Sequence, residues 1–346
     1  MYTGALLSVL GGACMGVCFL PMRHMKEAAW ENTWFIWALF FLVVFPPIIS
    51  FLAVPATAAV LSEVKGSTHL WVLAGGLVGG TSGILMGQGL RRIGMTLMNA
   101  IMNGVALIGG SLVPALISHR QALKGGMGLS LLAGLVLSTA GVVVCAMAAS
   151  QQTGSSAYMK AEDQKAGRRS VVALVGVALA AGAGLFQALM SITVDRFSVE
   201  YAEVASRYST WEPVASFPYF TLYFGASFVS NAVYCAHLWR KNGSLREFRA
   251  PGAMRFVLLS VVMAVVTIGG IFLWGWSLPL MSPYGAVVGW PIFLVATNLF
   301  AAVVECGYGD WKGKALRTLI LGLALQTLSM VAFGWFSKIA MGGGAS

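Results

Sequence analysis

Long stretches without a charged residue constrain this chain more than any other feature of its sequence. A helix needs about 20 predominantly apolar residues to cross a bilayer, and nine uncharged windows reach that length. They lie before residue 23 and between residues 31–63, 65–91, 92–120, 124–160, 169–195, 212–240, 255–305 and 317–338. The window from Phe256 to Val304 is double length and contains the turn signal Ser282-Pro283, so it is divided. The spacing therefore predicts an all-α integral membrane protein with ten transmembrane helices.

Composition and charge support lipid as the environment. The chain is 58% hydrophobic and 10% charged, which the surface of a water-soluble domain does not sustain. Its net charge of +10 is spread over short loops without interleaved aromatics, which argues against a nucleic-acid partner. Alternate loops hold sixteen of the 22 Lys and Arg residues, so the positive-inside rule places those loops in the cytoplasm and both termini outside. The first apolar segment lacks a basic leader and is predicted to be a helix, not a cleaved signal.

The chain offers little for catalysis or for a metal. Its five cysteines lie in or beside predicted helices and give no disulfide framework, and no Cys or His cluster completes a metal site. No cofactor is predicted. A polytopic membrane enzyme remains an alternative, but the sequence has no H-E-x-x-H or G-x-S-x-G motif and its four histidines are scattered.

An internal repeat divides the chain into halves. A polar segment at residues 151–169 is predicted to be a cytoplasmic linker between five-helix repeats at 1–150 and 170–346. Five residues of the fifth helix recur in the tenth at an offset of 188: Leu131, Gly134, Leu135, Leu137 and Thr139 match Leu319, Gly322, Leu323, Leu325 and Thr327. Because five is odd, the two copies enter the membrane from opposite sides. Inverted repeats around a central site are typical of secondary transporters that work by alternating access.

Uncharged polar and aromatic residues on the apolar windows are the candidates for binding a solute. Amide groups donate and accept hydrogen bonds, which suits the hydroxyls of a neutral solute, and aromatic faces suit the apolar face of a sugar ring. The candidate residues are Gln88, Asn99, Asn103, Gln187, Trp274, Trp276, Tyr284 and Trp290. The alternative is that the amides form interhelical hydrogen bonds and the aromatics anchor the helices in lipid.

Glu31 and a glycine strip complete the candidates. Glu31 begins the second window, and if it faces a cavity it can exchange a proton with bound solute. The alternative is a solvated residue favoured by the helix dipole. Glycines at positions 75, 79, 83 and 87 share one helix face. That face predicts close helix packing, and a smooth contact is also one that can slide.

Three segments resemble a known family. A Gly/Ala-rich stretch from Gly11 to Phe19 leads through Pro21 and Arg23 to Trp30-Glu31-Asn32-Thr33-Trp34. Gly89 to Thr96 reads G-L-R-R-I-G-M-T, and Gly309-Asp310-Trp311-Lys312 precedes the last window. In these segments, and in length over the whole chain, the sequence resembles the L-rhamnose-proton symporter family of the drug/metabolite transporter superfamily.

The resemblance implies sugar uptake coupled to protons in the inner membrane of a bacterium, with Glu31 in the coupling role. The expected partners are a small sugar such as L-rhamnose or a related monosaccharide, protons and the lipid bilayer, in a monomer or homodimer. Departures from the family pattern at Gln88, Asn99 and Asn103 leave the solute open. The superfamily also contains exporters, so a metabolite exporter or facilitator is the second hypothesis.

Overall fold

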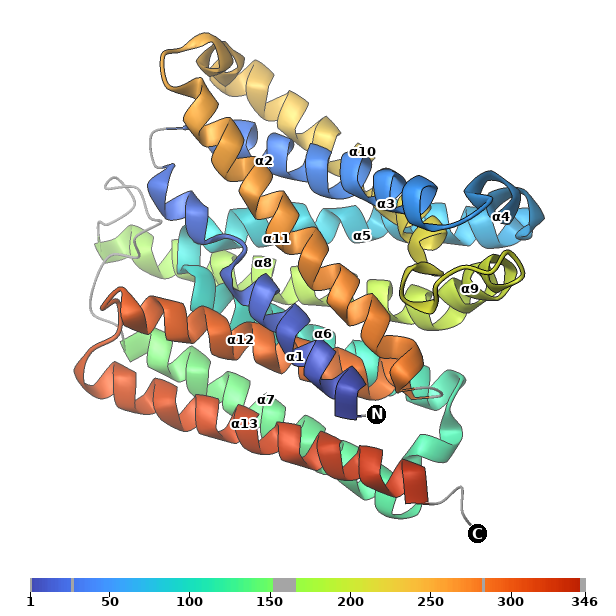
Figure 1. Ribbon diagram of the computed structural model, residues 1–346. Coiled ribbons are helices and arrows are strands. Elements are labelled where there is room, and N and C mark those ends of the chain that lie inside the picture. The colour runs from blue at the N-terminus through green and yellow to red at the C-terminus, as the bar shows by residue number, and fades with distance from the viewer. Residues whose placement is uncertain (1, 26–27, 152–165, 282–283, 343–346) are drawn as a thin grey trace.

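The computed structural model describes residues 2–25, 28–151, 166–281 and 284–342, and its regular elements there are all helical (Figure 1). The first half contains α1 (Tyr2–Val17), η1 (Leu20–His24), α2 (Trp30–Ala38), η2 (Leu39–Val44), α3 (Phe45–Ala53), α4 (Thr57–Glu63), α5 (Gly66–Ile93), α6 (Met95–Ile117), η3 (Arg120–Leu123) and α7 (Gly125–Gln151). The second contains α8 (Ala166–Thr193), η5 (Val194–Ser198), α9 (Val199–Ser206), η6 (Glu212–Val214), α10 (Phe217–Asn242), η7 (Ser244–Arg249), α11 (Ala253–Leu280), η8 (Gly285–Gly289), α12 (Trp290–Gly307) and α13 (Gly313–Gly342). The predicted linker falls mostly outside the described residues.

Of the ten predicted spans, nine contain a helix that is long and apolar enough to cross a membrane, counted over the described ranges. The remaining span, the seventh, contains α10, a continuous helix of 26 residues. At 1.5 Å per residue α10 is about 39 Å long, so its length suits a span. Its three tyrosines and its polar C-terminal turn make it less apolar than the others. The chain is a multi-pass membrane protein.

Three of the spans are continuous helices that include a wide π turn, η2, η5 and η8, and two of these turns, η2 and η8, lie before prolines. The second window runs from Trp30 to Ala53 through η2, directly before Pro46 and Pro47. Proline lacks the amide hydrogen that the preceding turn needs, and a π turn accommodates that loss. The turn η8 likewise precedes Pro291. The double-length window divides as predicted into α11 and α12, although Ser282 and Pro283 themselves lie outside the described residues.

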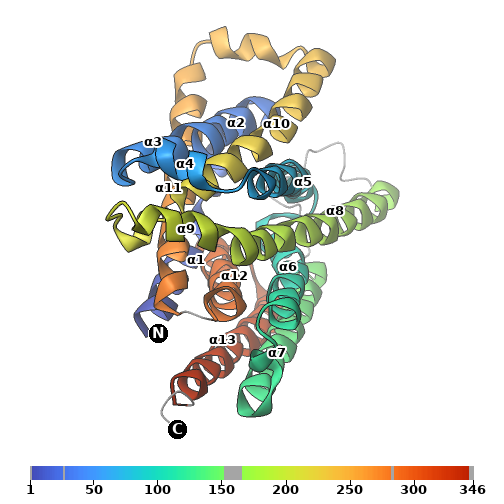
Figure 2. The same cartoon turned by 90° about the vertical axis from the view of Figure 1, so that its right-hand side faces the viewer.

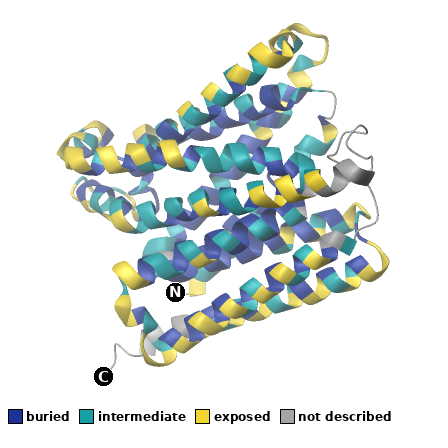
Figure 3. Ribbon diagram, turned by 180° about the vertical axis from the view of Figure 1, so that it is seen from behind, coloured by how far each residue is buried: buried dark blue, intermediate teal, exposed yellow. Residues whose placement is uncertain are grey.

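The outward faces of the helices are strongly apolar. On α7, Leu129 is 72% exposed and Val136 is 66% exposed, and similar residues recur along the neighbouring helix α13. Figure 3 shows these exposed positions alternating with buried ones on the outer helices. Contiguous apolar surface of this extent is unfavourable in water and is favourable against lipid tails.

The first helix of each half packs into the other half. The helix α1 contacts α11 and α12, and α8 contacts α5 and α6. Glycines make these approaches close, since a methyl group on Gly11 would lie 2.7 Å from the Gly270 carbonyl oxygen. Figure 2 shows α7 and α13 side by side at one edge of the bundle. The start of α1 and the end of α13 lie at the same end of the bundle (Figure 1).

The closest backbone packing of α5 against α10 is made by Gly76 and Gly80, which lie beside the predicted glycine strip. Methyl groups on Gly76 and Gly80 would collide with the backbone carbonyl oxygens of Tyr223 and Ser227 on α10. Gly79 and Gly83 face the space between the two halves. Gly76 and Gly80 therefore hold α5 against α10, while Gly79 and Gly83 of the predicted strip leave space between the halves.

The five cysteines lie on or beside the helices. All five are free in the structure, and Cys18, Cys145 and Cys235 are buried. Among the described residues, no group of three or more His, Cys, Asp or Glu side chains has the arrangement to hold a metal ion.

The contact between α5 and α10 yields a stability prediction. We expect Gly80→Ala to destabilise the protein by about 1–3 kcal/mol, because the added methyl group forces the two backbones apart. Gly225→Ala on α10 is the matched control, since a methyl group there meets no described atom within 4 Å. Thermal unfolding in detergent measures both. Equal midpoints for the two variants would contradict the packing described here.

Candidate functional site

A central cavity lies between the two halves, near the middle of the long helices. Its volume is about 120 Å³. Residues from α1, α2, α5, α6, α8, α10, α11 and α12 line it, so neither half forms it alone. The polar lining residues are Ser82, Gln187, Tyr223, Ser227, Asn231 and Thr267. The apolar lining consists mainly of aromatic rings and methionines: Phe19, Trp37, Phe41, Phe186, Phe224, Trp290, Phe293, Met15, Met86, Met102 and Met190.

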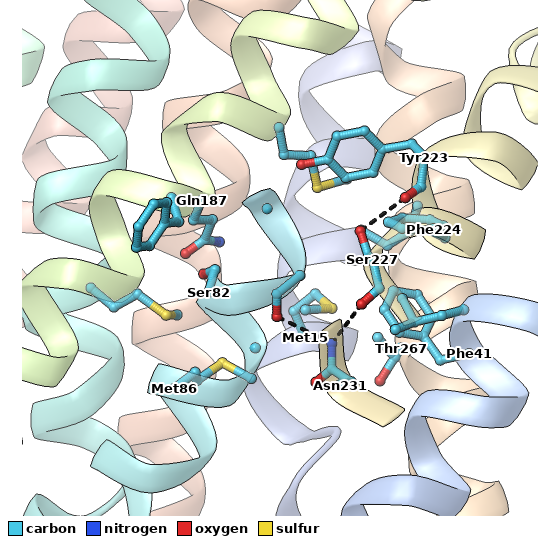
Figure 4. A pocket seen from close by; sticks show the side chains of 18 of the residues that line it. Met15, Phe41, Ser82, Met86, Gln187, Tyr223, Phe224, Ser227, Asn231 and Thr267 are labelled. Carbon is cyan, nitrogen blue, oxygen red and sulfur yellow. Dashed lines mark hydrogen bonds between the residues drawn. The ribbon is translucent and has the colours of Figure 1, made fainter. Parts of the chain in front are cut away.

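The polar residues at opposite walls of the cavity come from different helices: α5 and α8 supply one wall, and α10 supplies the other. Figure 4 shows Gln187 and Ser82 on one side, facing Tyr223, Ser227 and Asn231 on the other. Between them, α5 presents glycines: a methyl group on Gly79 would collide with the Tyr223 hydroxyl. The cavity thus depends on positions in α5 that carry no side chain.

Asn231 fixes one wall of the cavity. Its Oδ1 accepts a hydrogen bond of 2.9 Å from Trp34 Nε1. Its Nδ2 donates to the carbonyl oxygens of Gly80 at 3.1 Å and Ser227 at 2.9 Å. The side chain is 2% exposed, so all these bonds are made away from bulk water. The amide therefore joins α2, α5 and α10 at one point.

Gln187 differs from Asn231 because its acceptor is unused. Its Oε1 is buried and has no hydrogen-bond partner among the described residues. Buried polar atoms normally have a partner, and an exception calls for a specific explanation. The neighbouring Ser82 donates to the Ala183 carbonyl oxygen at 2.8 Å. Gln187 Oε1 is therefore available to a hydroxyl group that enters the cavity.

Gln187 and Trp290 are the sequence-predicted residues that line the cavity. Trp290 is 1% exposed, and its Nε1 donates to the Ala106 carbonyl oxygen at 3.2 Å. Its ring packs against Trp274, with ring centres 5.1 Å apart. Trp274 itself is fully buried behind Trp290 and does not belong to the lining.

The other predicted residues lie elsewhere. Gln88 accepts a hydrogen bond of 3.0 Å from Arg92 on its own helix. Asn103 donates to Asn298 at 2.8 Å and so joins α6 to α12, which fits the interhelical alternative. The remaining three are outside the lining: Asn99 is buried on α6, Trp276 packs against Trp211, and Tyr284 packs against His119.

Glu31 is buried but does not line the cavity. It is 2% exposed and lies at the start of α2. Its Oε1 accepts hydrogen bonds from Asn242 Nδ2 at 2.8 Å and from Ser244 Oγ at 2.5 Å. The next residue, Asn32, donates to the Ser244 carbonyl oxygen at 2.9 Å. Glu31 therefore binds the first half to the connection between α10 and α11.

Sequence reasoning missed the aromatic face of α2. Trp30, Trp34, Trp37 and Phe41 recur every three or four residues, which places them on one helix face. Trp34 and Trp37 have ring centres 4.5 Å apart, and Trp37 Nε1 donates to Thr267 Oγ1 at 3.0 Å. This spacing of three or four residues is visible in the sequence. It does not distinguish the wall of a cavity from a lipid-facing belt of aromatic residues.

The lining carries no Asp, Glu, Lys, Arg or His among the residues described. A cavity of hydroxyls, amides and aromatic rings suits a neutral solute that has both hydroxyl groups and an apolar face. A charged solute would lose its hydration there without gaining an ionic partner.

The role of Asn231 can be tested by its removal. We expect Asn231→Leu to destabilise the protein by about 1–3 kcal/mol, since the Trp34 indole and two carbonyl groups lose a buried partner. Val233→Ala, at an exposed position on the same helix, is the control and should leave the unfolding midpoint near that of the wild type. A thermal melt followed by tryptophan fluorescence compares them. Identical melts would show that the amide does not hold this wall.

Comparison with protein-family models gives a match over almost the whole chain. The model of the L-rhamnose-proton symport protein (RhaT) matches residues 1–341. An L-rhamnose-proton symporter of Cronobacter sakazakii is 23% identical over 337 residues, which are 95% of each chain. One of Mannheimia succiniciproducens is 24% identical over 330 residues, covering 92% of this chain and 93% of that protein. A symporter of the same name from Escherichia coli is 22% identical over 340 residues, which are 95% of each chain.

A solved structure supports the fold. A crystal structure that is 15% identical in sequence superimposes with a TM-score of 0.56. The alignment covers 98% of this chain and 99% of the other. At this identity the likeness concerns the fold alone.

Proposed function

The chain belongs to the L-rhamnose-proton symport protein family, and we propose that it takes up a small neutral sugar, L-rhamnose or a related monosaccharide, together with protons. Members of this family are membrane symporters, not enzymes. The observation that carries the choice of solute is the central cavity, with its hydroxyl and amide groups, aromatic rings and absence of charged residues in the described lining. Trp37 and Trp290 offer faces for a sugar ring, while Gln187 offers a free acceptor.

The proposal includes ten spans in two inverted five-helix repeats. The exchange of α1 and α8 between the halves supports it. α8 is antiparallel to α5, because Gly75 meets Thr193 and Ser82 meets Ala183. It is parallel to α6, because Met102 meets Gly184 and Gly110 meets Ser191. α1 likewise runs antiparallel to α11 and parallel to α12, as the neighbours of its glycines show. With α10 counted as a span, the two chain ends lie on one side of the membrane, which agrees with Figure 1.

The contact between α7 and α13 supports the same symmetry. A methyl group on Gly134 would lie 2.5 Å from the Phe333 ring, and one on Gly322 would lie 2.6 Å from Cys145 Sγ. Gly134 and Gly322 are 188 residues apart, and so are Cys145 and Phe333. Contacts that are reciprocal in this way are the signature of a two-fold axis between two elements.

The mechanism that fits this arrangement is alternating access. The cavity lies between the halves, so rocking one half against the other would expose it to each side in turn. We place the end with Arg23, Glu31 and the α10–α11 connection in the cytoplasm, because the basic loops gather there. The proposed location is the inner membrane of a bacterium.

Glu31 is the proposed carrier of the proton. Its carboxylate accepts hydrogen bonds from Asn242 and Ser244 across the boundary between the halves. An ionised carboxylate accepts stronger hydrogen bonds than a protonated one. Protonation of Glu31 would therefore loosen the cytoplasmic end, which couples the proton to the movement of the halves.

Sugar binding is tested by thermal stability. A neutral or deoxy monosaccharide at one hundred times its Kd should stabilise the purified protein by about 2.7 kcal/mol. Gln187→Leu should reduce this shift because the cavity loses its free acceptor. Gln88→Leu, outside the cavity, should keep it. Shifts with nucleotides or amino acids and none with sugars would overturn the proposed solute.

Proton coupling is tested at Glu31. We expect Glu31→Gln to abolish uptake driven by a pH gradient while leaving the unfolding midpoint intact, because a glutamine oxygen can still accept from Asn242 and Ser244. The control is Glu203→Gln, at an exposed position on α9. Reconstituted vesicles with an imposed gradient measure the uptake. Unchanged gradient-driven uptake in the Glu31 variant would remove the assigned role.

A further inference from the structure

Three ion pairs join the halves among the described residues: Arg207–Glu63 is exposed, and the other two are largely buried and lie at equivalent places. Arg23 Nη2 lies 2.5 Å from Asp310 Oδ2, and His119 Nε2 lies 3.0 Å from Asp195 Oδ1. Arg23 follows α1, and Asp310 lies between α12 and α13. Asp195 follows α8, and His119 lies between α6 and α7. Each of these two pairs therefore ties the first long helix of one half to the last connection of the other half.

The two pairs lie at opposite ends of the bundle. In Figure 1 the end of α1 and the α12–α13 connection are on the left, while the end of α8 and the α6–α7 connection are on the right. The central cavity lies between these ends, lined by residues from the middle of the helices. With the orientation proposed above, the Arg23 pair is cytoplasmic and the His119 pair is external.

Both pairs are largely removed from water. The side chains of Arg23 and Asp310 are 10% and 27% exposed, and those of His119 and Asp195 are 22% and 8% exposed. The Arg23 guanidinium also lies over the Tyr308 ring at 4.3 Å. Separating a buried pair leaves a charge without its partner, which is strongly unfavourable. Both ends are thus held together in this structure.

We propose that these ion pairs are the two gates of the transport cycle, opened one at a time, and that, of the two pairs themselves, His119–Asp195 is the one that responds to protons. This inference rests on the alternating-access function proposed above. An arginine keeps its charge under all physiological conditions, whereas a histidine changes charge between about pH 5 and pH 8. A protonated imidazole bonds a carboxylate more strongly than a neutral one does. External acid therefore holds the outer gate closed and favours opening toward the cytoplasm.

Among the described residues at the outer end, His119 and Asp195 face each other, and their neighbours are as follows. Tyr284, directly before the neighbouring turn η8, places its ring 5.9 Å from the His119 ring. The charged residues carried by the adjoining segments, Arg120, Lys124 and Arg196, are exposed. Glu200, one turn beyond on α9, accepts a hydrogen bond of 2.7 Å from Thr68.

The gates are tested by labelling a cysteine in the cavity. Ser82→Cys places a thiol in the lining, and a membrane-impermeant maleimide is applied to vesicles of either orientation. Asp195→Asn should raise the labelling rate severalfold from the outside and leave it unchanged from the inside. Asp310→Asn should do the reverse. The same variants with Ser82 retained report the background from the native cysteines. If both variants act equally from both sides, the pairs are not gates.

The proton response is tested with His119→Gln. Thiol reactivity itself falls in acid. The labelling rate is therefore measured at about pH 5 and about pH 8 for two proteins, one that retains His119 and the His119→Gln variant, and the two are compared at each pH. Acid should slow labelling from outside more in the protein with His119. An equal pH dependence in both would overturn the proton response, and this variant also tests the gate if Asp195→Asn does not fold. The assay uses no sugar, so it remains valid if the proposed solute is wrong.

Discussion

Close contact between helix backbones is the constraint on which the rest of this structure depends. In lipid there is no hydrophobic force between apolar helices, so they associate through packing, and small residues allow the backbones to approach. Gly12 and Gly16 of α1 meet the carbonyl oxygens of Phe293 and Thr297 on α12. Gly184 of α8 meets the Met102 carbonyl oxygen on α6 in the same manner. Each half therefore packs closely against the first helix of the other half.

The distribution of polar chemistry follows from this packing. The centre holds a cavity whose described lining carries no charged residue type, whereas Arg23–Asp310 and His119–Asp195 join the halves at the two ends. Buried charges are favourable only when they are paired, and a pair can be broken by a modest movement of the halves. A neutral solute passing through the centre meets no such ionic cost. In the proposed mechanism, binding and gating are thus separated along the length of the bundle.

Much of the architecture could be predicted from the sequence, but the site could be predicted only in part. Charge spacing located the helices, including α10, because ionised groups are expensive in lipid and mark the ends of the spans. Gln187 and Trp290 are candidates from the sequence that line the cavity. Trp37, Tyr223 and Thr267 were missed, because their helical spacing is the same in a cavity wall as in an ordinary packing face.

The sequence by itself determined the class of protein, the approximate positions of the long helices and the family, since these depend on local hydropathy and on motifs along the chain. Only the tertiary structure decided which polar residues remain free. Asn103 and Asn231 are bonded across helices, while Gln187 Oε1 has no partner within the described part of the chain. It also brought Arg23 to Asp310 and His119 to Asp195. The physical reason is that partners far apart in the chain are selected by three-dimensional packing, which periodicity does not encode.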